Sequence, residues 1–238
     1  MIFKISNDVV LAYPDLKIAI LTGTGVKISS VNNEIEALKR KIESEIRNKF
    51  SLETLIEHPF IAAWRDTYRS FGVKPKKYNP TAEALVRRIL HGEPIPTINT
   101  LVDSYLIVEA EYLLPIGGYD LDKIEGDIHL RYSPGGEQFV PLGRPEELEV
   151  TNSNEIVYSD DKKILTRKWN YKDCEQTKIT LSTTRVALFM EIADKRIPIE
   201  TLEKAIKRLE KLVLTYCGGE ITTFIALPSK RLEWKIEI

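Results

Sequence analysis

Apolar side chains recur every three or four residues over several stretches of the chain, as they do on the buried face of an α-helix. The stretches with this spacing, which we expect to form helices, are residues 31–50, 51–71, 80–91, 100–112 and 199–213. His58 and Pro59 break the second stretch, because the residue before a proline is disfavoured in a helix. The charge run Lys39, Arg40 and Lys41 is interpreted as the solvated side of the first helix, where charged side chains are normal.

Other stretches are short, rich in β-branched and aromatic residues, and bounded by turn residues, which is typical of strands. They cover residues 2–6, 16–24, 127–132, 155–158, 163–168, 178–182, 185–192, 220–227 and 232–238. Gly117 and Gly118 are expected to form a tight turn, since glycine tolerates positive φ and close backbone approach. Helices and strands follow one another without regular βαβ alternation. The pattern therefore predicts an α+β fold with an antiparallel or mixed, sandwich-like β-sheet core flanked by helices.

Residues 1–60 are predicted to form an N-terminal strand and helix extension. It packs on a core of residues 61–238, which includes the C-terminal helix and strands. We expect the two parts to make one compact unit, since a chain of 238 residues can bury one large core.

The composition, 43% apolar and 29% charged residues, describes a globular protein. No run approaches the roughly 18 apolar residues that a membrane span needs, and the start of the chain lacks a secretory signal. Cys174 and Cys217 give neither a disulfide framework nor a metal quartet, so they suit a reducing compartment. We therefore expect a cytoplasmic protein without a membrane partner. The net charge of −1 argues against a protein that coats nucleic acid, DNA included, but allows a local basic patch.

Motifs for nucleotide, zinc or serine-nucleophile chemistry are absent from the sequence, which has no Walker loop, GxGxxG, HExxH or GxSxG. The histidines His58, His91 and His129 are widely separated, with no Cys or carboxylate at ligand spacing. We therefore expect no metal site and no cofactor, and no nucleophile–base pair is recognisable.

Two groups of polar residues remain as candidate sites. The first surrounds Gly117 and Gly118 and consists of Asn99, Asp103, Tyr119, Asp120 and Asp122. The second follows an apolar strand and consists of Arg167, Lys168, Trp169, Asn170, Tyr171, Lys172 and Asp173. For Asp103 and Asp120, a buried cap or a turn anchor explains the residue as well as a role in a site. Trp169 and Tyr171 are either core residues or the rim of a pocket.

Five cations lie close together around Tyr78: Lys74, Lys76, Lys77, Arg87 and Arg88. One interpretation is that these cations simply lie on a solvated loop and helix face. The other is that they form a patch that contacts phosphates, because Lys and Arg bind a nucleic-acid backbone independently of its sequence.

Residues 94–127, PIPTINTLVDSYLIVEAEYLLPIGGYDLDKIEGD, resemble the signature of the editing domain of the phenylalanyl-tRNA synthetase β subunit. They resemble freestanding proteins built on that domain more closely still. Residues 64–90, 130–143 and 154–184 are similar to the segments on either side of the signature, in the same order. The similarity extends over about two-thirds of the chain.

The resemblance implies the fold of that editing domain and an activity, the hydrolysis of a wrong amino acid from mischarged tRNA. Editing of this kind removes the errors of a synthetase whose aminoacylation site discriminates poorly between similar amino acids. The expected partner is mischarged aminoacyl-tRNA, and a synthetase is a second candidate partner. Because the ester is already activated, a well-placed water and donors to the oxyanion can suffice.

The roles that the resemblance implies fall into three groups. The expected catalytic residues are Gly117, Gly118, Asp120 and Asn170. The expected substrate-binding residues are Asn99, Asp103, Tyr119, Arg167, Trp169, Asp173 and Glu175. The expected RNA-binding residues are Lys74, Lys76, Lys77, Arg87 and Arg88.

Some positions depart from the synthetase pattern. Gly117 stands where the synthetase module has a histidine, and Leu106 stands where it has an asparagine. Clearance of tyrosine, the synthetase's task, is therefore not expected, and a different aminoacyl group is. Asp173 or Glu175 is expected to contact its amino end or side chain. Two alternatives stay open, a module that binds tRNA or a synthetase without turnover, and an amino-acid-binding protein of the same fold.

Overall fold

The computed structural model describes residues 1–236. The helices are α1 (Asn7–Ala12), α2 (Asn33–Lys49), α3 (Leu52–Glu57), α4 (Pro59–Ser70), α5 (Thr81–Leu90), α6 (Thr100–Tyr112) and α7 (Ile199–Tyr216), with a 3-10 turn at Leu121–Lys123. The strands are β1 (Ile2–Ile5), β2 (Lys17–Thr24), β3 (Ile116–Asp120), β4 (Ile128–Tyr132), β5 (Gln138–Phe139), β6 (Glu149–Val150), β7 (Ile156–Ser159), β8 (Ile164–Arg167), β9 (Lys172–Asp173), β10 (Arg185–Ile192), β11 (Glu220–Ala226) and β12 (Glu233–Lys235). The end of the predicted strand 232–238 lies outside the described residues.

Two sheets lie face to face and enclose an aromatic core. The six-stranded sheet has the order β12-β1-β4-β7-β8-β9, and the four-stranded sheet has the order β11-β2-β10-β3. Phe3 of β1 and Tyr158 of β7 both contact Phe189 of β10, with ring centroids 5.1 and 5.4 Å apart. β1 and β4 pair in parallel, whereas the strands of the four-stranded sheet pair antiparallel. The predicted α+β fold with a mixed, sandwich-like core is therefore confirmed.

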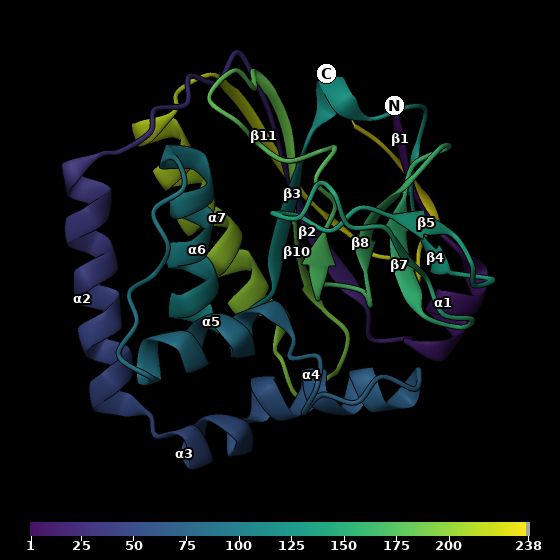
Figure 1. The fold of residues 1–238 in the computed structure, drawn as a ribbon, viewed down its shortest axis with the longest axis horizontal. Helices are drawn as coiled ribbons and strands as arrows, with labels where there is room; N and C mark the ends of the chain where they lie inside the picture. Colours follow the sequence, from purple (N-terminus) through teal and green to yellow (C-terminus); the bar gives the residue numbers. More distant parts are fainter. Residues whose placement is uncertain (237–238) are drawn as a thin grey trace.

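Helices cover the outer face of the four-stranded sheet. Figure 1 shows α6 and α7 between that sheet and α2, which forms the outermost layer, while α4 crosses below the sandwich. The buried side chains of α7 recur at three- and four-residue spacing, as predicted: Leu202, Ala205, Ile206, Leu209, Leu212 and Val213. His58 ends α3 and caps α4, with its Nδ1 atom accepting a hydrogen bond from Phe60 N.

The N-terminal segment shares both sheets with the rest of the chain. β1 lies between β12 and β4, and β2 lies between β11 and β10. Residues 1–60 and 61–236 therefore bury their apolar side chains in common. The short helix α1 was not predicted, because it is six residues long and buries Val9 alone among its residues, which leaves too little periodicity to detect.

Gly117 and Gly118 lie within β3, so the tight turn predicted for them is wrong. The chain leaves α6 earlier, at Leu113, whose φ of 56° is left-handed. A Cβ atom on Gly118 would overlap the Leu188 side chain of the paired strand β10. The glycine permits close packing here, which the sequence pattern cannot distinguish from a turn.

Two further expectations are also wrong. Residues 178–182 form a loop instead of a strand, because Thr180 N bonds the Thr183 side chain at 2.9 Å and closes a local turn. Lys39 is not solvated but 1% exposed. Its Nζ atom pairs with Asp103 Oδ2 at 3.2 Å and bonds Thr97 Oγ1 at 2.8 Å, so it joins α2 to α6 and the loop before it.

Candidate functional site

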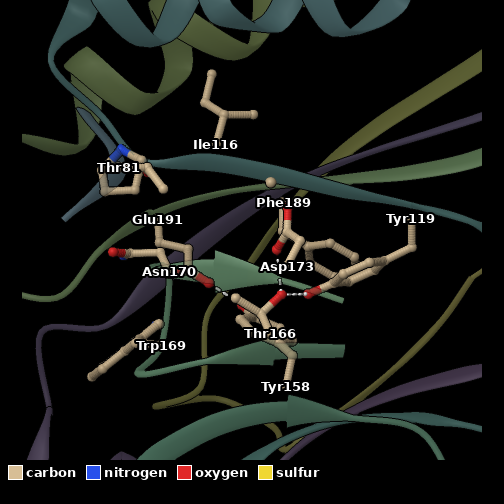
Figure 2. Close-up of a pocket in the computed structure, with 12 residues that line it drawn as sticks. Thr81, Ile116, Tyr119, Tyr158, Thr166, Trp169, Asn170, Asp173, Phe189 and Glu191 are labelled. Atoms are coloured by element: carbon tan, nitrogen blue, oxygen red, sulfur yellow. Dashed lines mark hydrogen bonds between the residues drawn. The ribbon is translucent and has the colours of Figure 1, made fainter. Parts of the chain in front are cut away.

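A small polar cavity, here called the deep pocket, lies between the two sheets. Strands of both sheets form its wall, together with the turn between β8 and β9 and the start of α5 (Figure 2). Its lining residues are Thr81, Pro115, Ile116, Gly117, Tyr119, Tyr158, Thr166, Trp169, Asn170, Asp173, Phe189 and Glu191. The space open to the centre of a water molecule is about 20 Å³, which is room for about one water.

Asp173 of β9 is held in the deep pocket by a chain of hydroxyl groups. Thr166 Oγ1 donates to Asp173 Oδ1 over 2.6 Å, and Tyr119 OH lies 2.6 Å from the same Thr166 oxygen (Figure 2). Burial raises the pKa of Asp173 to about 6, against the opposing effect of the Thr166 hydrogen bond. A Cβ atom on Gly117 would lie 3.7 Å from both carboxylate oxygens, so glycine leaves them uncovered. Asp173 can therefore accept a proton near neutral pH.

Glu191 of β10 is a second carboxyl group in the deep pocket, and it is 2% exposed. Tyr158 OH donates to its Oε1 atom. Burial raises the pKa of Glu191 to about 8, so the carboxyl group holds its proton at pH 7. The polar hydrogens of Trp169 and Asn170 face Glu191 and lower this pKa, but neither reaches hydrogen-bonding geometry.

Trp169 and Asn170 reach the deep pocket from a strained turn between β8 and β9. Lys168 and Trp169 have φ angles of 49° and 69°, in the left-handed region that bulky residues rarely adopt. The Trp169 ring packs edge-on against Trp64 of α4, with centroids 5.4 Å apart. Tyr68 OH donates to Asn170 Oδ1 over 2.6 Å. Such strain persists only where surrounding contacts impose it, and it is common at functional sites.

A larger cavity, here called the outer pocket, shares Asp173 with the deep pocket. Its volume is about 520 Å³. Its lining residues, which are mostly apolar, are Ile98, Val102, Tyr105, Gly118, Leu142, Gly143, Pro145, Asp173, Cys174, Glu175, Lys178 and Ile179. Glu175 at the rim accepts a hydrogen bond from Gly143 N at 2.9 Å and pairs with Lys178.

The backbone of β3 borders the outer pocket. β3 is the last strand of its sheet, and Asp120 N donates across the free edge to Thr177 O at 3.0 Å. N–H groups alternate between the two edges of an antiparallel strand. The N–H of Gly118 therefore points across the same free edge, on the side of the outer pocket that Gly118 lines.

The predicted lysine patch lies next to the deep pocket, because its loop runs directly into Thr81. Lys74, Lys76 and Lys77 are exposed, and none forms an ion pair within residues 1–236. Beside them, the Tyr78 and Tyr171 rings meet edge to face at 5.1 Å.

The two arginines of the predicted patch are held by acidic neighbours. Arg87 pairs with Glu83 at 3.7 Å, and Arg88 pairs with Glu93 at 2.9 Å. The three lysines are therefore the free cations of this group, as far as the described chain shows.

Two of the predicted substrate-binding residues stabilise the start of α6. Asn99 Oδ1 accepts hydrogen bonds from the N–H groups of Leu101 and Val102 and caps the helix. Asp103 Oδ1 accepts from Ile98 N at 2.9 Å, and Oδ2 pairs with Lys39. Both side chains are buried, and within residues 1–236 neither lines a pocket described above.

Asp120 and Arg167 are also placed away from the two pockets, as far as the described residues show. Asp120 accepts from Asp122 N at 3.0 Å and from Thr183 Oγ1 at 2.8 Å, so both carboxylate oxygens are occupied. Arg167 is buried and bonds Glu155 at 2.7 Å. The structure gives no support to a catalytic Asp120 or a substrate-binding Arg167, and Asp120 fits the alternative of a structural anchor.

Glu191, Thr166 and Tyr158 were missed by sequence reasoning. Each stands in a short apolar strand whose pattern reads as core. A usable signal was Glu191 itself, since a carboxyl group inside the run RVALFMEI is rarely buried without a purpose.

Within residues 1–236, no three His, Cys, Asp or Glu side chains gather in a way that could hold a metal ion. Over the same residues, every helix is too short or too polar to cross a bilayer.

Residues 63–218, more than half of the chain, match the family described as the B3/4 domain. The chain belongs to the B3/4 domain family. This result confirms the resemblance to the synthetase β-subunit domain that the sequence predicted. The match covers β3, β8, β9 and β10, so both pockets of this B3/4 domain lie inside it.

Curated relatives of this B3/4 protein are phenylalanine–tRNA ligase β subunits. The chain is 27% identical over 165 residues to that of Dechloromonas aromatica (strain RCB), which covers 59% of this chain and 20% of the relative. It is 39% identical over 71 residues to that of Legionella pneumophila (strain Lens), covering 30% and 9%. The chain therefore spans a fifth or less of these relatives. A solved N-terminal fragment of the phenylalanyl-tRNA synthetase β subunit from Pyrococcus horikoshii is similar, with a TM-score of 0.46 and 13% identity, over 92% of this chain and 49% of that chain.

Proposed function

We propose that this B3/4 protein is an aminoacyl-tRNA deacylase, which removes a wrong amino acid from mischarged tRNA in trans. The observation that carries the proposal is the position of Asp173. Its carboxylate lines both pockets, faces the bare Cα of Gly117, and has a pKa near 6. The family match and the synthetase relatives supply the substrate class.

In the proposed reaction, Asp173 orients a water molecule and accepts its proton. The water oxygen attacks the ester carbonyl carbon, and the bond between that carbon and the ribose oxygen then breaks. The proton passes from Asp173 to the departing ribose oxygen, so the carboxylate is regenerated. Because the ester is activated, orientation supplies most of the required rate enhancement.

The N–H of Gly118 is the proposed donor to the oxyanion. It points across the free edge of β3, beside the outer pocket, and it is fixed by the strand pairing with β10. A preorganised backbone donor of this kind needs no rearrangement as negative charge develops on the carbonyl oxygen.

The outer pocket is the proposed site of the aminoacyl ester and the terminal nucleoside. Its volume of about 520 Å³ suits a group of that size. The loop that carries Lys74, Lys76 and Lys77, here called the lysine loop, contributes phosphate contacts. The Tyr78 and Tyr171 rings offer a surface for stacking a base.

The test is deacylation of a panel of labelled aminoacyl-tRNAs by the purified protein. We expect loss of the ester from at least one member, well above its spontaneous rate. If every ester in the panel stays at its spontaneous rate, the deacylase proposal is refuted.

A second candidate is a tRNA-binding module without turnover, because Gly117 stands where the synthetase module has a histidine. The same panel separates the two, since tight binding without ester loss supports the module. A third possibility is an amino-acid-binding protein that binds no RNA, and a salt titration of tRNA affinity tests it. Affinity that falls as salt rises indicates phosphate contacts and excludes this possibility.

A further inference from the structure

Four buried polar atoms of residues that line the deep pocket have no hydrogen-bond partner among the described residues. They are Nε1 of Trp169, Nδ2 of Asn170, Oε2 of Glu191 and, at the start of α5, Oγ1 of Thr81. The first three belong to side chains that are 0%, 8% and 2% exposed. Buried polar groups are normally paired, so three orphans around one small space indicate that a polar ligand group belongs there.

The direction of each orphan is fixed by its neighbours. Asn170 Oδ1 accepts from Tyr68 OH at 2.6 Å, so the Nδ2 end of the amide is turned away from Tyr68. Glu191 Oε1 accepts from Tyr158 OH, which leaves Oε2 for a ligand. The Trp169 ring is held between Trp64 and Tyr13, with centroids 5.4 and 4.8 Å away. The cavity is therefore built in advance.

A hydroxyl group matches this set of atoms. Its lone pairs can accept two of the three hydrogens that the site presents, on Trp169 Nε1, on Asn170 Nδ2 and on Oε2 of Glu191, which carries the acid proton because Oε1 accepts from Tyr158. The open space of about 20 Å³ holds a group of about the size of one water.

We propose that the deep pocket binds the side-chain hydroxyl of the aminoacyl group, which makes seryl and threonyl esters the substrate class. This inference rests on the proposed function, because it takes Asp173 as the group beside the reacting ester. Asp173 lines the deep pocket itself, so the ester carbon lies close to it. Only a short side chain can then place its hydroxyl in the same cavity. The phenol of a tyrosyl ester lies too far from its ester carbon.

The decisive comparison is threonine against valine, which have the same shape and differ by the hydroxyl. A valyl methyl group would fill the same space and leave all three orphans unpaired. We expect kcat/KM for a threonyl ester to exceed that for a valyl ester by at least about 100-fold on the same tRNA. Serine should exceed alanine by less, because the shorter alanyl side chain lets a water stay in place.

The variant Asn170→Asp tests the recognition directly. It keeps the oxygen that accepts from Tyr68 and replaces the Nδ2 donor with an acceptor. We expect the threonine-to-valine ratio to fall at least about tenfold, since a site that loses one of its donors no longer distinguishes the hydroxyl. The exposed Asn48→Asp should leave the ratio unchanged. An unchanged ratio in Asn170→Asp would overturn the assignment.

Stable analogues separate this inference from the deacylase proposal. Amide-linked threonyl and valyl derivatives of 3′-amino-3′-deoxyadenosine cannot be hydrolysed, so their binding can be measured by calorimetry. Tighter binding of the threonyl analogue, with no ester hydrolysed in the panel, supports the hydroxyl site and refutes the deacylase. Equal binding of the two analogues, or a tyrosyl ester hydrolysed faster than a threonyl ester, overturns the hydroxyl site even where deacylation occurs.

Discussion

The carboxylate of Asp173 accepts a hydrogen bond from Thr166 on one oxygen and faces the bare Cα of Gly117 with both. Burial raises its pKa to about 6, so most of the group is ionised at pH 7 and still basic enough to take a proton from water. A single carboxylate in this position can orient a water without a histidine. The glycine at 117 is then part of the site, because a side chain there would cover the carboxylate.

Replacing Asp173 with asparagine should abolish most of the deacylation. The amide keeps the shape and can still bond Thr166, but it cannot accept a proton. We expect kcat/KM to fall by at least about 100-fold, within the usual range for loss of a general base. The measurement is release of label from the best substrate of the panel. Asp122→Asn is the matched control, since Asp122 pairs with Arg185 at the surface, and a similar fall in both variants would contradict the role of Asp173.

At the residue scale, the sequence could reveal part of the site. The polar run before Asp173 stands out after an apolar strand, so Trp169 and Asn170 could be identified as candidates. Glu191 and Thr166 could not, because a strand side chain faces inward or outward according to register, and the register is set by pairing with distant strands. For Asn99 and Asp103 the sequence could not decide between a cap and a ligand, since the two roles use the same atoms.

At the scale of elements, a buried ion pair joins α2 to α6. Lys39 and Asp103 are each 1% exposed, and their charged atoms lie 3.2 Å apart. Burial raises the pKa of Asp103 even with Lys39 beside it, so the pairing offsets only part of the desolvation. The pair therefore fixes the position of the helices, and the loop before α6 that reaches the outer pocket, more than it adds stability.

Lys39→Met should destabilise the protein by about 3–5 kcal/mol, because it leaves the Asp103 carboxylate buried without a cation. Urea denaturation followed by circular dichroism gives the free energy of unfolding. The double variant Lys39→Met with Asp103→Asn should recover part of the loss, since the uncompensated charge is gone. Lys41→Met, at an exposed position on the same helix, should change stability by less than about 0.5 kcal/mol. Equal effects at positions 39 and 41 would show that the buried pair is unimportant.

Element boundaries were predicted well where periodicity was long and poorly where glycine or threonine carried the signal. α2, α6 and α7 follow their apolar stripes closely. Gly117 and Gly118 were misread because glycine marks both turns and close strand contacts, and only the Leu188 side chain on β10 decides between them. The loop 178–182 looks like a strand by composition, yet side-chain hydrogen bonds of threonine compete with sheet pairing there.

At the scale of the whole molecule, buried carboxyl groups set the response of stability to pH. Burial raises the pKa of Glu109 and of Glu191 to about 8. Between about pH 5 and 8 the folded protein therefore holds protons that the unfolded chain has lost. Stability falls as pH rises through this range. Burial lowers the pKa of His58, so this group makes stability rise with pH. It involves one proton, whereas the two glutamates involve two.

We expect the free energy of unfolding to decrease from pH 5.5 to pH 8, and Glu191→Gln to flatten this decrease. Glutamine resembles the protonated acid and can still accept from Tyr158, so the variant should match the wild type at pH 5.5. At pH 8 it should be more stable by about 1 kcal/mol or more. Urea titrations at four pH values measure both proteins. The exposed Glu57→Gln should show the wild-type slope, and a stability that rises with pH in the wild type would contradict the assignment.

The lysine loop predicts how the whole molecule meets RNA. Lys74, Lys76 and Lys77 are exposed, lack ion pairs within the described residues, and lead into the wall of the deep pocket at Thr81. If they contact phosphates, changing all three to glutamine should lower tRNA affinity. The slope of log affinity against log salt should then become shallower by about 2 to 3, because each contact releases about one counterion.

The matched control changes three lysines of α7, Lys204, Lys207 and Lys211, which are exposed but lie on a helix away from the pockets that the structure describes. Filter binding over a range of salt concentrations gives both slopes. Because the two triple variants lose the same total charge, a difference between them isolates local contact from general attraction. Equal slopes would place the RNA elsewhere on the surface. They would contradict the proposal that tRNA contacts the lysine loop while its aminoacyl end lies at Asp173.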